Sequence, residues 1–197
     1  SGNATRSYQT QYVAFGAIDT NAFHFSGAPN FDRYLERLFA TLPNLKRIWL
    51  TGVSAGGYGA PLNYTRVSAK FPQAEVHLLA DSSPFLRTNL HWTEWKDTWA
   101  MQLPAACPTC DAGFPEVMEH LSTTYPSRRL ALLATEADQV ITWFFYGGNG
   151  PSEFTNPPYS AYAAALNPLL AGYDTHANSK YFVVPGMEHV LIQGYGL

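Results

Sequence analysis

Residues 46–59, KRIWLTGVSAGGYG, constrain the fold of this chain more than any other stretch. An apolar run typical of a strand ends at Ser54, which stands between Gly52 and Gly56, and a helical pattern follows over residues 55–70. A turn this tight leaves no room for flanking side chains, so we expect Gly52 and Gly56 to be required by it. The stretch predicts a serine hydroxyl presented between the end of a strand and the start of a helix.

Short apolar runs alternate with helical stretches along most of the chain. Strands are predicted over 46–51, 74–81, 128–135 and 179–186, helices over 29–42, 55–70 and 138–145, and a strand or strand remnant over 11–16. This alternation is typical of an α/β fold with a mostly parallel sheet flanked by helices. Together with the serine turn it predicts the α/β-hydrolase fold, as a single domain over residues 1–197.

The alternation fails between residues 84 and 126, where we expect a helical, cap-like insertion. Trp92, Trp95 and Trp99 recur there at spacings of three and four, which places them on one face of a helix. This face could cover a substrate site or belong to the ordinary core. Trp92, Trp95 and Tyr58 are the candidate substrate contacts.

A neutral serine is a weak nucleophile, so Ser54 requires a general base and a carboxylate that orients the base. In α/β-hydrolases the chain order is serine, acid, histidine. Asp138 follows the predicted strand 128–135 and His189 follows the strand 179–186, both at the edge of the sheet where Ser54 lies. The sequence predicts a Ser54, Asp138, His189 triad, with the Ala55 N–H and, less directly, the Gly57 N–H as oxyanion donors.

Two other carboxylates remain open as the acid of the triad. Glu136 lies two residues before Asp138, and Asp81 closes the strand 74–81. The alternative for Asp81 is a structural role, in which its carboxylate holds a loop by accepting hydrogen bonds from backbone N–H groups.

Composition excludes several classes of function. The net charge is −3 with no basic run, and no apolar stretch approaches the length of a membrane helix, so neither nucleic acid nor a membrane is an expected partner. Cys107 and Cys110 lack the further ligands of a metal site. We expect them to form a short disulfide in a secreted or periplasmic protein, although a reduced, inert pair is the alternative.

Several motifs together resemble the pectin acetylesterase and Notum type of carboxylesterase. They are HFSGAPNFDRYLERLF, WLTGVSAGGYGAPLNY, LLADSSPFL, LATEADQVI and GMEHVL. The family elbow commonly reads Gly-Cys-Ser-Ala-Gly; Val53 replaces the cysteine here, as in some bacterial members. The resemblance runs from about residue 20 to the C-terminus, and the segment 84–126 matches it poorly.

The resemblance implies a secreted serine esterase that removes acetyl or other short acyl groups from a polysaccharide, without metal or cofactor. It also implies an N-terminal portion with several strands and a Gly-rich loop that supplies further oxyanion donors. No such loop precedes Ser54, so a separate N-terminal segment of the same protein is an expected partner. The alternatives are a polyester depolymerase or lipase-like esterase, an inactive glycan-binding relic, and a serine peptidase of the same fold.

Overall fold

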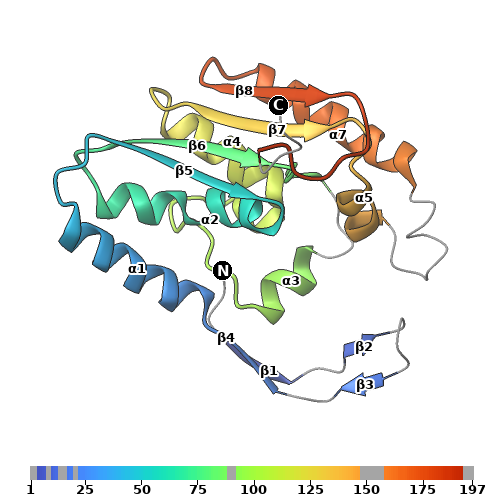
Figure 1. Cartoon of the computed structure of the whole chain (residues 1–197), viewed down its shortest axis with the longest axis horizontal. Coiled ribbons are helices and arrows are strands. Elements are labelled where there is room, and N and C mark those ends of the chain that lie inside the picture. Colours follow the sequence, from blue (N-terminus) through green and yellow to red (C-terminus); the bar gives the residue numbers. More distant parts are fainter. Residues whose placement is uncertain are drawn as a thin grey trace.

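A four-stranded parallel sheet forms the centre of the molecule (Figure 1). The computed structural model describes residues 4–7, 10–12, 17–19, 22–87, 92–146 and 158–192. The strands lie side by side in chain order: β5 (Arg47–Val53), β6 (Glu75–Asp81), β7 (Leu130–Thr135) and β8 (Ser179–Val184). Their carboxyl ends therefore meet at one edge of the sheet, where loops can bring distant residues together.

The longer helices lie against one face of this sheet. Because consecutive parallel strands are joined by right-handed crossovers and the strand order never reverses, all crossover helices fall on the same face. These are α2 (Ala55–Lys70), α4 (Phe114–Thr124) and α7 (Tyr159–Asp174), with α1 (Gly27–Thr41) packed on α2 and α5 (Gln139–Tyr146) packed on α7. The arrangement confirms the predicted α/β class with a parallel sheet.

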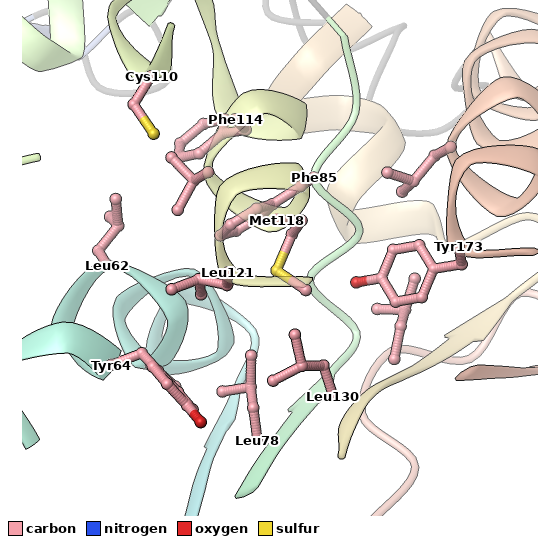
Figure 2. Close-up of a cluster of buried hydrophobic side chains, with 14 of the residues drawn as sticks. Leu62, Tyr64, Leu78, Phe85, Cys110, Phe114, Met118, Leu121, Leu130 and Tyr173 are labelled. Carbon is pink, nitrogen blue, oxygen red and sulfur yellow. The ribbon is translucent and has the colours of Figure 1, made fainter. Parts of the chain in front are cut away.

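The core fills the space between the sheet and these helices (Figure 2). Leu78 and Leu130 project from the sheet, Leu62 and Tyr64 from α2, and Met118 with Leu121 from α4; the side chains of all six are at most 5% exposed. The Tyr64 hydroxyl, the only polar group of this buried side chain, donates a hydrogen bond to the carbonyl of Val76 on β6.

The opposite face of the sheet is much less covered in the described part of the chain. Trp49 on β5 is 53% exposed and Phe182 on β8 is 64% exposed. The Trp49 ring lies 5.0 Å from the ring of His77 on the neighbouring strand.

The described part of the segment 84–126 contains two helices with different positions in the fold. Its first helix, α3 (Trp92–Thr98), carries the tryptophans, and a single 3-10 turn, η1 (Cys110–Ala112), follows it. Its second helix, α4, is the crossover helix between β6 and β7, and Val117 and Leu121 on it are fully buried. The cap-like insertion expected over the whole segment is therefore wrong for α4, and for the part before α4 it stays a prediction.

The N-terminal strands form two separate antiparallel pairs outside the main sheet. β1 (Ala4–Ser7) pairs with β4 (Ala22–Phe25), and β2 (Thr10–Tyr12) pairs with β3 (Ala17–Asp19). Residues 11 and 12 of the strand predicted over 11–16 lie in β2, and residues 13–16 lie outside the described residues.

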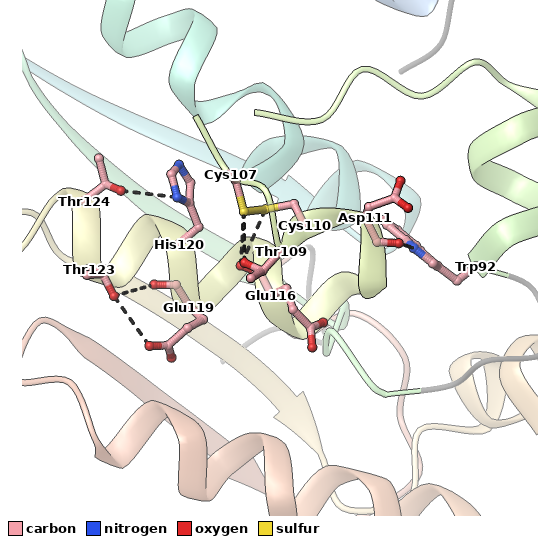
Figure 3. Close-up of a disulfide and its surroundings, with 10 residues drawn as sticks. All are labelled: Trp92, Cys107, Thr109, Cys110, Asp111, Glu116, Glu119, His120, Thr123 and Thr124. Carbon is pink, nitrogen blue, oxygen red and sulfur yellow. Dashed lines mark hydrogen bonds between the residues drawn. A yellow bond between two sulfur atoms is a disulfide. The ribbon is translucent and has the colours of Figure 1, made fainter. Parts of the chain in front are cut away.

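Cys107 and Cys110 form a disulfide between α3 and α4 (Figure 3), which confirms the expected pairing. Cys110 is fully buried, and the Thr109 hydroxyl lies 3.6 Å from the sulfur of Cys107. Nearby, the Trp92 indole N–H donates to the Asp111 carbonyl at 2.9 Å, and the Lys96 ammonium pairs with the Asp111 carboxylate at 2.6 Å. The contacts of Trp92 and Lys96 join α3 to the turn before α4, which the disulfide closes.

Candidate active site

Ser54 lies at the turn between β5 and α2, in the geometry that the motif predicts. Its φ of 53° is in the left-handed region, which is unusual for a residue other than glycine and is the strained conformation of a nucleophile elbow. The Ser54 N–H donates to the carbonyl of Asp81 at the end of β6, at 2.8 Å. The elbow is therefore anchored to the neighbouring strand.

The glycines at positions 52, 56 and 57 differ in whether the structure leaves room for a Cβ atom. A Cβ atom on Gly52 would lie 2.0 Å from the carbonyl oxygen of Gly56, so Gly52 is needed, as expected. A Cβ atom on Gly56 would meet nothing within 4 Å, and the expectation that Gly56 is required is wrong. Gly57 is required instead, because its Cβ atom would lie 1.9 Å from the hydroxyl oxygen of Ser83.

The structure brings Ser54, His189 and Asp138 together as one hydrogen-bonded chain. The Oγ atom of Ser54 lies 2.7 Å from Nε2 of His189, and Nδ1 of His189 lies 2.8 Å from Oδ2 of Asp138. Asp138 is fully buried, and the His189 side chain is 17% exposed. A neutral imidazole with its proton on Nδ1 donates to Asp138 and offers Nε2 as the acceptor for the serine proton.

Asp138 is held in place by the start of α5. Its Oδ1 atom accepts a hydrogen bond from the Ile141 N–H at 2.9 Å, and its carbonyl oxygen accepts one from the Thr142 N–H. The carboxylate therefore caps the first turn of α5 while it faces His189. A carboxylate at a helix N-terminus is stabilised by the exposed N–H groups there.

Two tyrosines lie near the buried charge of Asp138. The Tyr58 hydroxyl donates to the Pro84 carbonyl at 2.8 Å, and the Tyr162 hydroxyl donates to the Thr135 carbonyl at 3.1 Å. Burial raises the pKa of both hydroxyls, and the charge of Asp138 raises it further. Both phenols therefore stay neutral donors, and they hold the loop after β6 and the end of β7 near Asp138.

Asp81 is a neighbour of the site but does not contact His189 through its side chain. Its carboxylate accepts hydrogen bonds from the N–H groups of Leu191 and Ile192, at 2.9 and 2.6 Å, and from the Ser82 hydroxyl at 3.0 Å. This arrangement matches the structural alternative considered for Asp81. Glu136 donates its own N–H to the Val184 carbonyl between β7 and β8, and Asp138 is the carboxylate that faces the imidazole.

Three of the sequence predictions for the site need correction or limitation. The Gly57 N–H donates to the Ser54 carbonyl at 2.8 Å, so it is not available as an oxyanion donor. The Ala55 N–H has no acceptor among the described residues, so its role as an oxyanion donor stays a prediction. Trp92 is 4% exposed and belongs to the core, so its proposed substrate contact is wrong. The ring of Tyr58 stacks on Phe85 at 5.3 Å, which makes it a packing residue beneath the elbow.

Trp95 remains a candidate for a substrate contact. It is partly buried, and its ring stacks on that of Trp99 at 5.8 Å and meets Phe145 of α5 edge-on at 5.5 Å. Through Phe145 the tryptophan helix α3 contacts α5, the helix that begins beside Asp138. Whether α3 covers the substrate stays a prediction.

Sequence reasoning missed two residues that hold the histidine loop. The Thr135 hydroxyl donates to the Glu188 carbonyl at 2.8 Å, and the Ser82 hydroxyl oxygen accepts from the Val190 N–H at 2.8 Å. Both are fully buried. A polar residue at the end of an apolar strand is the sequence signal that could have indicated them, since Thr135 ends β7 and Ser82 follows β6 directly.

Comparison with protein families finds a match to part of the chain. The family model for pectinacetylesterase matches residues 6–100, which include the elbow and β6. No curated protein matches the chain. The matched family is one of carboxylic ester hydrolases with the α/β-hydrolase fold, so the predicted enzyme class and fold are confirmed. The resemblance seen in the sequence motifs is thereby confirmed over residues 6–100, where the chain is similar to the pectinacetylesterase family.

Proposed function

We propose that this protein is an exported serine esterase that removes acetyl or other short acyl groups from a polysaccharide. One observation carries the proposal: a serine, a histidine and a buried carboxylate from three separate loops form a continuous chain of hydrogen bonds, at 2.7 and 2.8 Å. The family supports an ester substrate such as an acetylated polysaccharide.

In the proposed reaction, Ser54 Oγ attacks the ester carbonyl carbon while Nε2 of His189 accepts the serine proton. Asp138 holds the imidazole in the required tautomer and stabilises the imidazolium that forms. The tetrahedral intermediate places its negative oxygen at the Ala55 N–H, at the start of α2. Collapse of the intermediate passes the proton from His189 to the sugar hydroxyl that leaves, and an acyl-serine remains.

Water then completes the cycle on the same residues. His189 takes a proton from the water, which attacks the acyl carbonyl, and the second tetrahedral intermediate releases the acid as Ser54 Oγ recovers its proton. The chain needs only Ser54, His189, Asp138 and an oxyanion donor for these steps. A second oxyanion donor from a separate N-terminal segment of the same protein stays a prediction.

We also propose a single domain over residues 1–197 and a secreted or periplasmic location. The Cys107–Cys110 disulfide supports export, because disulfides persist in oxidising compartments. None of the described helices combines the length and apolar character needed to cross a membrane.

The test is hydrolysis of p-nitrophenyl esters from acetate to palmitate and release of acetate from acetylated pectin and xylan, by wild type and Ser54→Ala. Ser122→Ala is a matched control, since Ser122 is a buried serine of α4 at 4% exposure and lies outside the triad. We expect wild type and Ser122→Ala to turn over short esters and Ser54→Ala to be inactive. A preference for palmitate would favour the lipase-like alternative, and equal inactivity of wild type and Ser54→Ala would contradict the proposal.

A further inference from the structure

The loop that carries His189 is held by buried side chains on both sides of the histidine. On the N-terminal side the Thr135 hydroxyl donates to the Glu188 carbonyl. On the C-terminal side three successive N–H groups, of residues 190, 191 and 192, donate to the side chains of Ser82 and Asp81. The loop thus depends on the ends of β6 and β7, not on contacts of the imidazole alone.

Asp81 also holds the nucleophile. Its carbonyl accepts the Ser54 N–H at 2.8 Å, while its carboxylate accepts the N–H groups of Leu191 and Ile192. One fully buried residue therefore contacts the turn that presents the serine and the loop that presents the base. The two catalytic side chains come from segments 135 residues apart, and Asp81 connects both of them at the end of one strand.

The backbone beside His189 is strained and requires this support. Val190 has a φ of 72°, a conformation that is an outlier for a β-branched residue. Ser82, which accepts the Val190 N–H, has a φ of 51°. Such conformations are unfavourable on their own and persist only where the surrounding structure holds them. The hydrogen bonds that the side chains of Asp81 and Ser82 accept hold the backbone in this conformation next to His189.

We propose that Asp81 and Ser82 are positioning residues for the esterase reaction, which set the approach of His189 to Ser54. The inference rests on the proposed function. Without the Asp81 carboxylate, two buried N–H groups lose their acceptor and the loop must move to find another. A displacement of the base by about 1 Å can cost about 100-fold in rate, although the displaced group makes no contact with substrate.

Asp81→Asn tests this with little change in size. The amide keeps one oxygen for the three donors that the carboxylate accepts, which are the Leu191 N–H, the Ile192 N–H and the Ser82 hydroxyl, and its NH₂ group can accept from none of them. We expect kcat and kcat/KM for p-nitrophenyl acetate to fall together by about 10- to 100-fold, which indicates lost transition-state stabilisation and not weaker substrate binding. Ser82→Ala removes the Val190 contact and the hydrogen bond to Asp81 but leaves the Asp81 carboxylate on Leu191 and Ile192, so we expect a smaller loss of about 3- to 10-fold.

Ser122→Ala separates positioning from a general loss of stability. The Ser122 hydroxyl is similarly buried, contacts the Met118 carbonyl and the Ser179 hydroxyl, and lies toward the start of β8, at the other edge of the sheet. We expect it to lower the melting temperature about as much as Ser82→Ala while kcat stays unchanged. All assays are made at a temperature at which each variant is fully folded.

Hydrogen exchange of the backbone gives a readout that does not depend on turnover. In Asp81→Asn and Ser82→Ala, we expect exchange over residues 187–192 to increase at least tenfold, while exchange over β7 stays as in the wild type. The inference is overturned if exchange over 187–192 is unchanged, or if kcat of an active enzyme is unchanged in Asp81→Asn. An inactive wild type would instead contradict the proposed function, and exchange alone would then decide whether Asp81 holds the loop.

Discussion

Asp81 ends β6 and Asp138 follows the end of β7 by three residues; both are fully buried, yet their partners differ. Asp138 faces the imidazole of His189, and Asp81 faces backbone N–H groups. Their positions in the sequence could suggest either as the acid, because both follow an apolar strand. The choice depends on where the loop after β8 folds back, which is a tertiary contact and not a local pattern.

Asp138→Asn is expected to lower kcat by about 10⁴-fold, far more than Asp81→Asn. The asparagine can satisfy Nδ1 only with the wrong tautomer of His189, which then has a proton on Nε2 and cannot accept one from Ser54. Steady-state hydrolysis of p-nitrophenyl acetate measures this, with melting curves to show that both variants are folded. The assignment is contradicted if Asp81→Asn loses more activity than Asp138→Asn.

At the scale of elements, local sequence predicted the strands and the elbow well. The helix expected over 55–70 matches α2 at both ends, and the strand expected over 46–51 is β5. These boundaries are predictable because glycines and the ends of apolar runs mark them in the sequence. Helix α7 was missed: it follows Pro158 and contains Pro168, and prolines inside a pattern argue against a helix. The need for Gly57 was also not predictable, since it depends on Ser83 of a neighbouring segment.

Gly52→Ala should destabilise the elbow and abolish activity. Its Cβ atom would overlap the backbone of Gly56 and Gly57, at 2.0 to 2.7 Å, so β5 and α2 must separate. We expect a loss of more than about 2 kcal/mol in the free energy of unfolding. Gly59→Ala is the matched control, because nothing lies within 4 Å there and alanine favours the helix by about 0.5–1 kcal/mol. Urea denaturation compares the two; equal stability would contradict the steric argument.

Removal of the disulfide should lower stability with little effect on catalysis. Cys107 and Cys110 are separated by three positions, and closure of so short a loop is expected to contribute about 2 kcal/mol. The double variant Cys107→Ser/Cys110→Ser should unfold at a lower urea concentration while it retains wild-type kcat, because the pair lies in the α3–α4 connection and not at the triad. A large loss of kcat in the folded variant would show that α3 helps to form the active site.

At the scale of the whole molecule, the alternation of elements was sufficient to predict a parallel sheet, but not which of its faces would be covered. That depends on the handedness of the crossovers and on the order of the strands. Trp49 and Phe182, which look like core residues in the sequence, lie on the less covered face for this reason.

The stability of the fold should decrease as the pH falls below about 6.5. Burial lowers the pKa of His77 and of His120 from the usual 6.5, so the unfolded chain binds protons in a range where the folded protein does not. The contribution is fully present above 6.5 and is lost as the pH falls toward the folded-state pKa. For His77 the Arg129 N–H donates to Nδ1 at 3.1 Å, and the Glu75 carboxylate, 3.9 Å from Nε2, opposes the shift only in part.

Urea denaturation between pH 7.5 and 5 measures this dependence. We expect His77→Gln to have a flatter profile than the wild type, and His77→Gln/His120→Gln to be flatter still. A profile for the double variant that is as steep as that of the wild type would show that other groups cause the loss.

The contact between Trp49 and His77 gives the protein an internal optical signal. Trp49 is the exposed member of the pair, its ring lies 5.0 Å from the imidazole, and it is the tryptophan of β5. A charge that arises on the imidazole changes the surroundings of the indole, so the emission of Trp49 should follow the protonation of His77, with Trp49→Phe as the blank. The titration of one strand residue can then be observed in the folded protein without any label.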